Sequence, residues 1–204
     1  KEMAQNEADP LDVMSETQEK QEGVSVRPPN PFGFIGLYTQ QLFNLSDHKG
    51  KVVLLVNTAC QSEKSGQLEQ LDMVYRKYRE RGLAVFCLPC GDFGTEYPSN
   101  SQIKQYFIER NFSFYATESI HVKEGPQQHA LFTWIGEFYP HLLPESDFHK
   151  ILVGRDGALR CVIPSFTSPL DSDLLEIIED LKYQSKKKKK RCLTNQKKKR
   201  LLSP

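Results

Sequence analysis

The sequence predicts an α/β domain with a central mixed β-sheet covered by helices. Two short apolar runs, Val52–Thr58 and Leu83–Leu88, are typical of strands buried on both sheet faces. Between and after them, apolar residues recur at helical spacing. Near the C-terminal end, Arg155-Asp156-Gly157 is a strong turn signal between two further strand-like runs. Helices alternating with strands and followed by a hairpin indicate a mixed sheet with helices packed against it.

The folded part is expected to begin near Pro31. Strand-like aromatic residues occupy 34–43, and 46–50 read as a turn before the first buried strand. A helix is expected over Glu63–Arg81, where Leu68 and Leu71 begin a helical apolar pattern, and Gly82 should end it.

The later elements follow the same reasoning. Their expected bounds are a helix at 100–111, a weak strand at 114–116, a short helix or turn at 131–138, and a hairpin of 150–153 with 159–163. Ser168 should cap a last helix with Pro169 at its first position, and its apolar residues are Leu174, Ile177, Ile178 and Leu181. The order β-α-β-α-β-β-α is that of a thioredoxin-like sheet.

The charge pattern divides the chain of 204 residues into three parts: an acidic N-terminal arm (1–30), one folded domain (31–183) and a polybasic tail (184–204). The arm's composition predicts disorder. Ten of the 27 basic residues lie in the tail. The rest of the chain has 17 basic and 26 acidic residues, so its net charge is −9. The tail's basic residues are Lys186, Lys187, Lys188, Lys189, Lys190, Arg191, Lys197, Lys198, Lys199 and Arg200.

Cysteine usage and hydropathy suggest an intracellular protein, either nuclear or cytoplasmic and cytoskeletal. No apolar stretch approaches the ~18 residues that a membrane span needs, and no signal peptide is visible at the start. Five cysteines form an odd set, Cys60, Cys87, Cys90, Cys161 and Cys192. This set favours free thiols over a secreted disulfide framework.

Five segments resemble the glutathione peroxidase family, in family order and at family spacing. They are LSDHKGKVVLLVNTA (45–59), LPCGDFGTEYP (88–98), EGPQQHALFTW (124–134), FHKILVGRDG (148–157) and IPSFTSP (163–169). The resemblance covers roughly 31–183 and implies a thioredoxin-like fold of the glutathione peroxidase type. It also implies peroxide reduction with a thiol donor, and a short 129–150 stretch like that of the monomeric, phospholipid-acting branch.

The resemblance fails at the residues that carry the family's chemistry. A cysteine or selenocysteine attacks peroxide there, and a glutamine, a tryptophan and an asparagine hold it as the anion. Matched residue by residue, these positions fall on Ser62, Asp92, Ser146 and Asp147. The resolving thiol that many cysteine members carry falls near Phe107.

A serine hydroxyl is not ionised at neutral pH and cannot be oxidised to a sulfenic acid. Carboxylates at Asp92 and Asp147 would raise the pKa of a neighbouring thiol. We therefore expect a pseudo-peroxidase that serves as a structural or binding module, with no cofactor. Glutathione would be a co-substrate only if the protein were active.

Cys60, two residues before Ser62, leaves one active alternative open. It could be a relocated nucleophile of a thiol peroxidase that reduces hydroperoxides. It could equally be a small buried residue at a strand end, where free cysteines are common.

Two other chemical patterns are weaker. Cys87-Leu-Pro-Cys90 resembles a redox CxxC, but cysteines three apart at a strand end point to opposite faces, which disfavours a disulfide. A hydrolase triad of Ser62, an aspartate and His149 lacks the expected nucleophile elbow, and His149 is expected at a surface or edge. The five histidines show no metal-ligand spacing, so no metal site is expected.

The polybasic tail is the other candidate functional feature. Its two basic runs resemble a bipartite nuclear import signal, and their charge suits an acidic protein surface, nucleic acid or an anionic membrane. No aromatic residues are interleaved for base stacking. A solvated tail that only aids solubility, and lipidation at Cys192, remain open.

Overall fold

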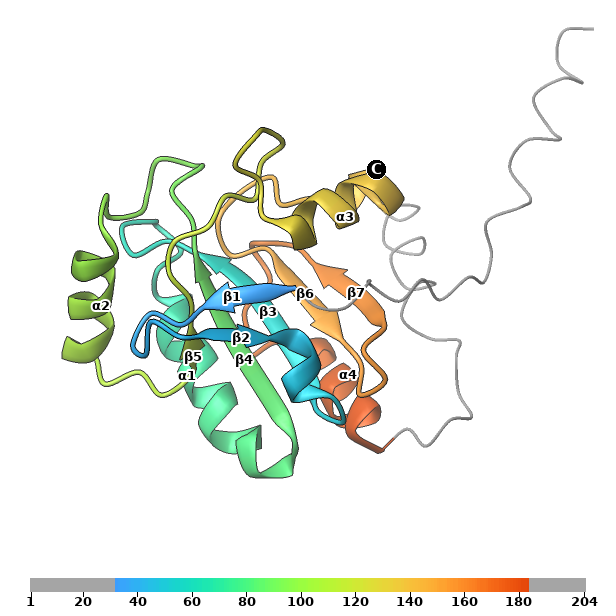
Figure 1. Ribbon diagram of the computed structural model, residues 1–204. Coiled ribbons are helices and arrows are strands. Elements are labelled where there is room, and N and C mark those ends of the chain that lie inside the picture. Colours follow the sequence, from blue (N-terminus) through green and yellow to red (C-terminus); the bar gives the residue numbers. More distant parts are fainter. Residues whose placement is uncertain (1–31, 184–204) are drawn as a thin grey trace, which may run out of the picture.

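The computed structural model describes residues 32–183, which form a mixed β-sheet with helices on both faces (Figure 1). The sheet has five strands in the order β5-β4-β3-β6-β7. Their bounds are β3 Val52–Thr58, β4 Leu83–Pro89, β5 Tyr115–Ala116, β6 Lys150–Val153 and β7 Leu159–Ile163. Strands β3, β4 and β5 are parallel, whereas β6 runs antiparallel to β3 and β7 antiparallel to β6. The expected arms and Cys192 lie outside the described residues.

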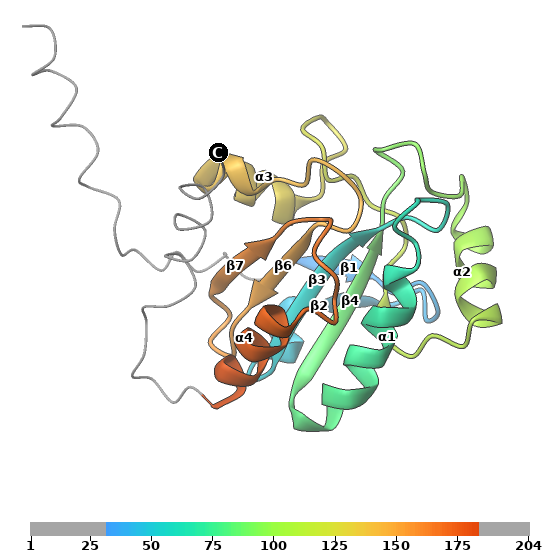
Figure 2. The ribbon, with the colours of Figure 1, turned by 180° about the vertical axis from the view of Figure 1, so that it is seen from behind.

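The two faces of the sheet carry different elements. Helices α1 (Gln67–Tyr78) and α4 (Ser172–Tyr183) cover one face, as Figure 2 shows. The hairpin of β1 (Gly33–Ile35) and β2 (Leu42–Asn44) crosses the other face, towards α3 (Ala130–Phe138). The remaining helices are α2 (Asn100–Glu109), which packs on the α1 side, and the short turns η1 (Leu45–His48), η2 (Arg79–Arg81) and η3 (Pro140–Leu142).

The apolar runs explain why the sheet is the centre of the core. Every residue of β3 and β4 is buried. Side chains alternate between faces along a strand, so Val52, Leu54 and Val56 pack with α1 and α4. Val53 and Leu55 pack on the other face with α3. The sheet therefore has one apolar layer on each side, as the sequence predicts.

Several element bounds match the expectations. Strands β6 and β7 have the predicted limits, and Gly157 in their turn has φ 80°. Gly82 ends the α1–η2 segment in the left-handed region, with φ 87°. Among residues 32–183, no helix is both long enough and apolar enough to cross a membrane.

Both long helices begin later than predicted. Residues 63–66 form turns, with the amide of Ser65 donating to the carbonyl of Ser62, and α1 starts only at Gln67. The cap of α4 is Asp171, whose Oδ1 accepts from the amides of Asp173 and Leu174. Ser168 does not cap that helix, because its hydroxyl is engaged with Gln70 and the amide of Leu170.

Candidate functional site

Ser62 lies just after the carboxyl end of β3, in the turn that leads to α1. The neighbouring end of β4 holds this turn: the carbonyl of Thr58 accepts from the amide of Cys90, and Gln61 donates to Thr95. Ser62 is only 7% exposed, and its Oγ accepts a hydrogen bond from the amide of Lys64 at 3.3 Å. No hydrogen bond in residues 32–183 joins this hydroxyl to a side-chain base. The hydroxyl therefore caps a turn.

Ser146 lies against the same turn. The Nζ of Lys64 donates to its Oγ at 3.5 Å, and the side-chain amide of Asn57 donates to its carbonyl at 3.0 Å. The structure thus brings together Ser62 and Ser146, which are 84 positions apart in the sequence. Through these contacts, β3 positions both predicted site residues.

Asp147 contributes a buried carboxylate to the site. The hydroxyl of Thr95 donates to its Oδ2, whereas its Oδ1 is buried without a hydrogen-bond partner among the described residues. Asp147 also acts electrostatically on Glu96: burial and the charge of Asp147 raise the pKa of Glu96, although several hydrogen bonds oppose this.

Glu96 is a site residue that the sequence argument missed. Its Oε1 accepts hydrogen bonds from the amides of Cys60 at 3.2 Å and Tyr97 at 2.8 Å. Its Oε2 is buried without a partner in the described chain. The signal was available in the segment LPCGDFGTEYP, where an acid follows the end of a buried strand.

Asp92 is turned towards a different part of the chain. Its carboxylate accepts from the amides of Val122 (2.6 Å) and Lys123 (2.9 Å), and it pairs with His121 Nδ1 at 2.6 Å. These contacts fasten the 121–123 loop to the end of β4. No hydrogen bond among the described residues joins Asp92 to Ser62. The second acid near the reactive position is therefore Glu96, and the structural role of Asp92 corrects our expectation.

The surroundings of Cys60 disfavour a thiolate, although the charge of Arg110 has a small effect in the opposite direction. It is 5% exposed, and burial followed by the nearby Glu96 carboxylate raises the pKa of its thiol far above the ordinary value. A reactive cysteine needs access and positive surroundings. The geometry consequently weighs against Cys60 as a relocated nucleophile.

The two cysteines of the CxxC pattern lie on opposite faces of the sheet. Cys87 packs with the α1 side and Cys90 with the α3 side, both buried and neither in a disulfide. Burial is the largest cause that raises the pKa of both thiols, that of Cys90 to about 12. This placement agrees with the strand geometry expected from the sequence.

His149, expected at a surface or edge, directly precedes β6. It is half-buried, its Nε2 has no hydrogen-bond partner among the described residues, and the ring bonds to the backbone of Leu142. Burial, aided by the charge of Lys150, lowers the pKa of His149 to about 4. No hydrogen bond in the described chain links it to Ser62, so a triad is not formed. Within residues 32–183, no group of three or more His, Cys, Asp or Glu side chains could hold a metal ion.

Lys150, the first residue of β6, is a buried cation that the sequence argument also missed. It is 0% exposed, and its Nζ donates to the carbonyls of Phe148 at 2.8 Å and Ser165 at 3.5 Å. Burial, with a smaller effect of Lys64, lowers its pKa to about 7. The region thus contains two lysines and two buried acids but no described thiol that is both accessible and ionised.

Comparison with known proteins decides the family. The glutathione peroxidase family model matches residues 35–136, which is half of the chain. The chain belongs to the glutathione peroxidase family. Three of the five segments that resemble the family lie inside this match, namely 45–59, 88–98 and 124–134.

Individual relatives agree. The glutathione peroxidase homolog BsaA of Staphylococcus epidermidis is 32% identical over 126 residues, covering 59% of this chain and 78% of the relative. The hydroperoxy fatty acid reductase of Synechocystis is 35% identical over 124 residues, covering 55% of this chain and 73% of the relative. The crystal structure of Trgpx in apo form has a TM-score of 0.59 at 27% identity, covering 76% of this chain and 95% of that one.

These comparisons confirm the thioredoxin-like fold of this glutathione peroxidase family member. The structure of residues 32–183 therefore shows the family's scaffold.

Proposed function

We propose that this glutathione peroxidase family member is a catalytically inactive scaffold that acts as a binding module, with its polybasic tail engaging an acidic partner. The observation that carries the first half is the hydroxyl of Ser62, fixed by the amide of Lys64 where the family's chemistry requires a thiolate. Buried Glu96 and Asp147 support it, because negative charge disfavours a second anion at the same place.

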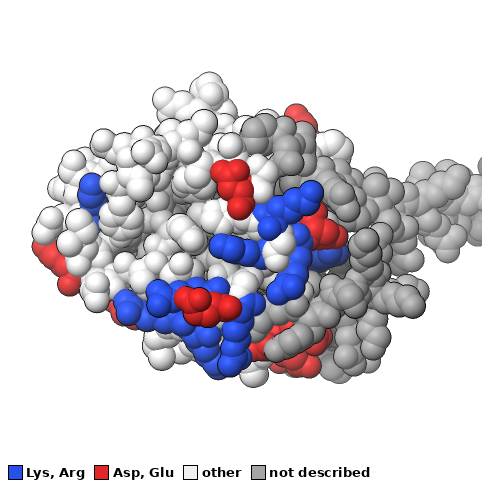
Figure 3. Space-filling view, turned by 60° about the horizontal axis from the view of Figure 1, so that its bottom comes forward, with Lys and Arg blue, Asp and Glu red and all other residues white. Residues whose placement is uncertain are grey.

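The face of the domain at the bottom of Figure 1 supports the proposed contact with an acidic partner. Figure 3 shows Lys and Arg side chains gathered on this face. The ion pair of Arg81 with Glu179 at 3.7 Å ties the last turns of α4 to η2. Arg155 adds a further cation here: its guanidinium would lie 3.3 Å from a Cβ placed on Gly82, and its carbonyl accepts from the amide of Gly50. Helix α4, which precedes the tail in the sequence, ends at Tyr183, four positions after Glu179, so charges of the body and of the tail could act on one polyanion.

Truncation tests the role of the tail. The full chain and a chain ending at Gln184 are compared for binding to three probes: polyglutamate, duplex DNA and phosphatidylserine vesicles. We expect salt-dependent binding to polyglutamate, the probe for an acidic protein surface, and expect truncation to abolish it. A chain in which the ten basic tail residues are replaced by glutamine is the matched control for length. Equal binding by all three chains would contradict the proposal.

The active alternative is a thiol peroxidase with Cys60 as nucleophile, and the names of the relatives favour it. One relative is a hydroperoxy fatty acid reductase, which makes an organic hydroperoxide the substrate to test. Cys60→Ala separates the hypotheses: turnover in the native protein that this change removes would establish the alternative.

The location expected from the tail is nuclear, or cytoplasmic and cytoskeletal. A fluorescent fusion of the full chain should lose that location when residues 184–204 are removed.

A further inference from the structure

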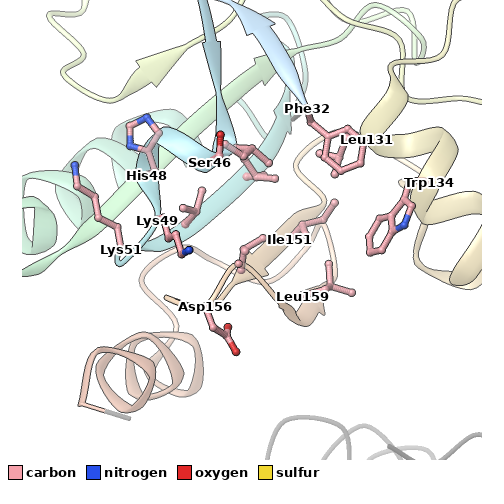
Figure 4. A pocket seen from close by; sticks show the side chains of 16 residues that line it. Phe32, Ser46, His48, Lys49, Lys51, Leu131, Trp134, Ile151, Asp156 and Leu159 are labelled. Carbon is pink, nitrogen blue, oxygen red and sulfur yellow. The ribbon is translucent and has the colours of Figure 1, made fainter. Parts of the chain in front are cut away.

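A cavity of about 150 Å³ lies on the α3 side of the sheet, away from the site around Ser62 (Figure 4). Its floor is apolar and comes from two adjacent strands: Val53 and Leu55 of β3, and Ile151 and Val153 of β6. Trp134 and Leu131 of α3 form the wall at one side. The cavity therefore presents an apolar surface that a side chain of suitable shape could cover.

The opposite edge of the cavity is positively charged. Lys49 and Lys51 line it, on the side away from Trp134 in Figure 4. Neither lysine forms an ion pair within residues 32–183, whereas Asp156 at the same edge is paired with Arg160 at 2.6 Å. An apolar floor beside two unpaired cations suits an occupant with apolar side chains and carboxylates.

The described chain begins at this cavity. Phe32 lines it, and its ring lies 6.2 Å from that of Trp134, centroid to centroid. The 31 residues before Phe32 therefore start from the cavity wall. They include one segment of the required chemistry, EADPLDVMSE at residues 7–16, which we call the acidic segment. It holds four acids, no lysine or arginine, and the apolar residues Leu11, Val13 and Met14.

We propose that the acidic segment binds in this cavity of its own chain, with Leu11 and Met14 on the apolar floor and its carboxylates against Lys49 and Lys51. Residues 17–31 form the connection. A random coil of 15 residues has a root-mean-square span of roughly 20 Å, so a connection of this length can reach the cavity. A connection of this length gives an effective concentration in the millimolar range, so weak contacts suffice.

Trp134 provides the test, because it is the single tryptophan of the chain and lines the cavity. Quenching of its fluorescence by acrylamide, a neutral quencher, is measured on the full chain, on Leu11→Ser with Met14→Ser, and on the matched control Val24→Ser with Val26→Ser. The control removes two apolar side chains from the same arm outside the acidic segment. We expect the quenching constant to rise about twofold in the first variant, as an occupant held by millimolar-range local concentration is released, and to stay at the native value in the control.

Charge exchange tests the ionic contacts. Lys49→Glu with Lys51→Glu should raise quenching as the serine variant does. Adding Asp9→Lys, Asp12→Lys and Glu16→Lys to that chain should restore the native value. A loss of stability at the cavity would not be restored by changes in a distant segment, so restoration is specific to the proposed contact.

Cross-linking with a carbodiimide distinguishes the chain's own segment from that of a second copy. Peptides joining Lys49 or Lys51 to residues 7–16 should be recovered from the monomer at micromolar or lower protein concentration. Their recovery only from a dimer would overturn the proposal in favour of a second copy. Native quenching in both variants without any such peptide would overturn it altogether.

Discussion

The backbone amide of Cys60 donates a hydrogen bond to Oε1 of Glu96 at 3.2 Å, which places a buried carboxylate at the end of β3. Peroxide reduction by thiols depends on an ionised sulfur at this end of the sheet. The carboxylate acts in the opposite direction, because it raises the pKa of a nearby thiol. The surroundings of Ser62 would therefore disfavour an ionised sulfur at this position.

Restoring the sulfur alone should not restore activity. In Ser62→Cys, the introduced thiol would lie in a 7% exposed position near Glu96 and Asp147, without the family's three supporting residues. We expect hydroperoxide consumption no faster than that of Ser62→Ala, and an alkylation rate that reports a thiol pKa above the ordinary ~8.5. Efficient turnover by this single variant would show that the surroundings are still competent.

Glu96→Gln should stabilise the protein at neutral pH. Burial raises the pKa of Glu96, so its stability contribution is greatest below the unfolded pKa and falls as the pH rises through the folded value. The glutamine oxygen can still accept from the amides of Cys60 and Tyr97. Denaturant unfolding should show a gain in the free energy of unfolding at pH 7.5 that disappears near pH 4. Glu137→Gln, on the exposed side of α3, is the control and should change little at either pH.

Asp92→Asn should destabilise the protein at neutral pH. Burial opposes the ionised form of Asp92, but hydrogen bonds from Lys123, His121 and Val122 outweigh it and lower its pKa. A carboxylate whose pKa is lowered by folding stabilises the protein at pH values above its unfolded-state pKa. This stabilisation is lost as the pH falls through the folded-state pKa. We expect a loss of roughly 1–3 kcal/mol at pH 7, measured by denaturant unfolding. The loss should shrink as the pH falls below about 4, where the native carboxylate also becomes protonated.

Asp92→Asn should not change the rate of hydroperoxide consumption, because the Asp92 carboxylate bonds to the 121–123 loop. Faster hydrogen exchange confined to that loop would locate the effect. An equal loss of stability at pH 7 and pH 2 would contradict the ionic role of Asp92.

Lys150→Met should remove part of the pH dependence of the free energy of unfolding. The folded pKa of Lys150, about 7, lies below its ordinary 10.5, so the unfolded chain binds more protons between these values. The stability of the native protein must then rise with pH across that window. Relative to the methionine variant, the native free energy of unfolding should rise by roughly 2 kcal/mol from pH 7 to pH 9.

The exposed Lys77→Met serves as the control for losing a lysine from the surface. It should follow the native curve throughout. Parallel curves for the native protein and Lys150→Met would mean that Lys150 stays charged in the fold.

The fold was predictable because its main signals are local. The apolar runs of β3 and β4 are buried along their full length, and the Asp156-Gly157 turn fixes the β6–β7 hairpin. The start of α4 was mispredicted because two residues could cap it. Ser168 has the right chemistry, but its hydroxyl is used by Gln70 of α1, a contact made only in the tertiary structure.

The site was only partly predictable. Strand spacing and the family resemblance placed Ser62 and gave Asp147 its acidic role. They could not show that Asp92 faces the 121–123 loop, since that depends on how loop and strand end pack together. Glu96 reaches Cys60 across 36 positions, and Lys150 is buried in a strand where a charged residue suggests a surface position.

Steady-state consumption of hydrogen peroxide and a fatty acid hydroperoxide by the native full chain tests the central claim most directly. The assay supplies glutathione or thioredoxin as donor, with Ser62→Ala as the matched control and an active family member as the positive one. We predict that the native chain and the control both match the rate of buffer. Native turnover comparable to that of the active relative, abolished in Ser62→Ala, would contradict the account.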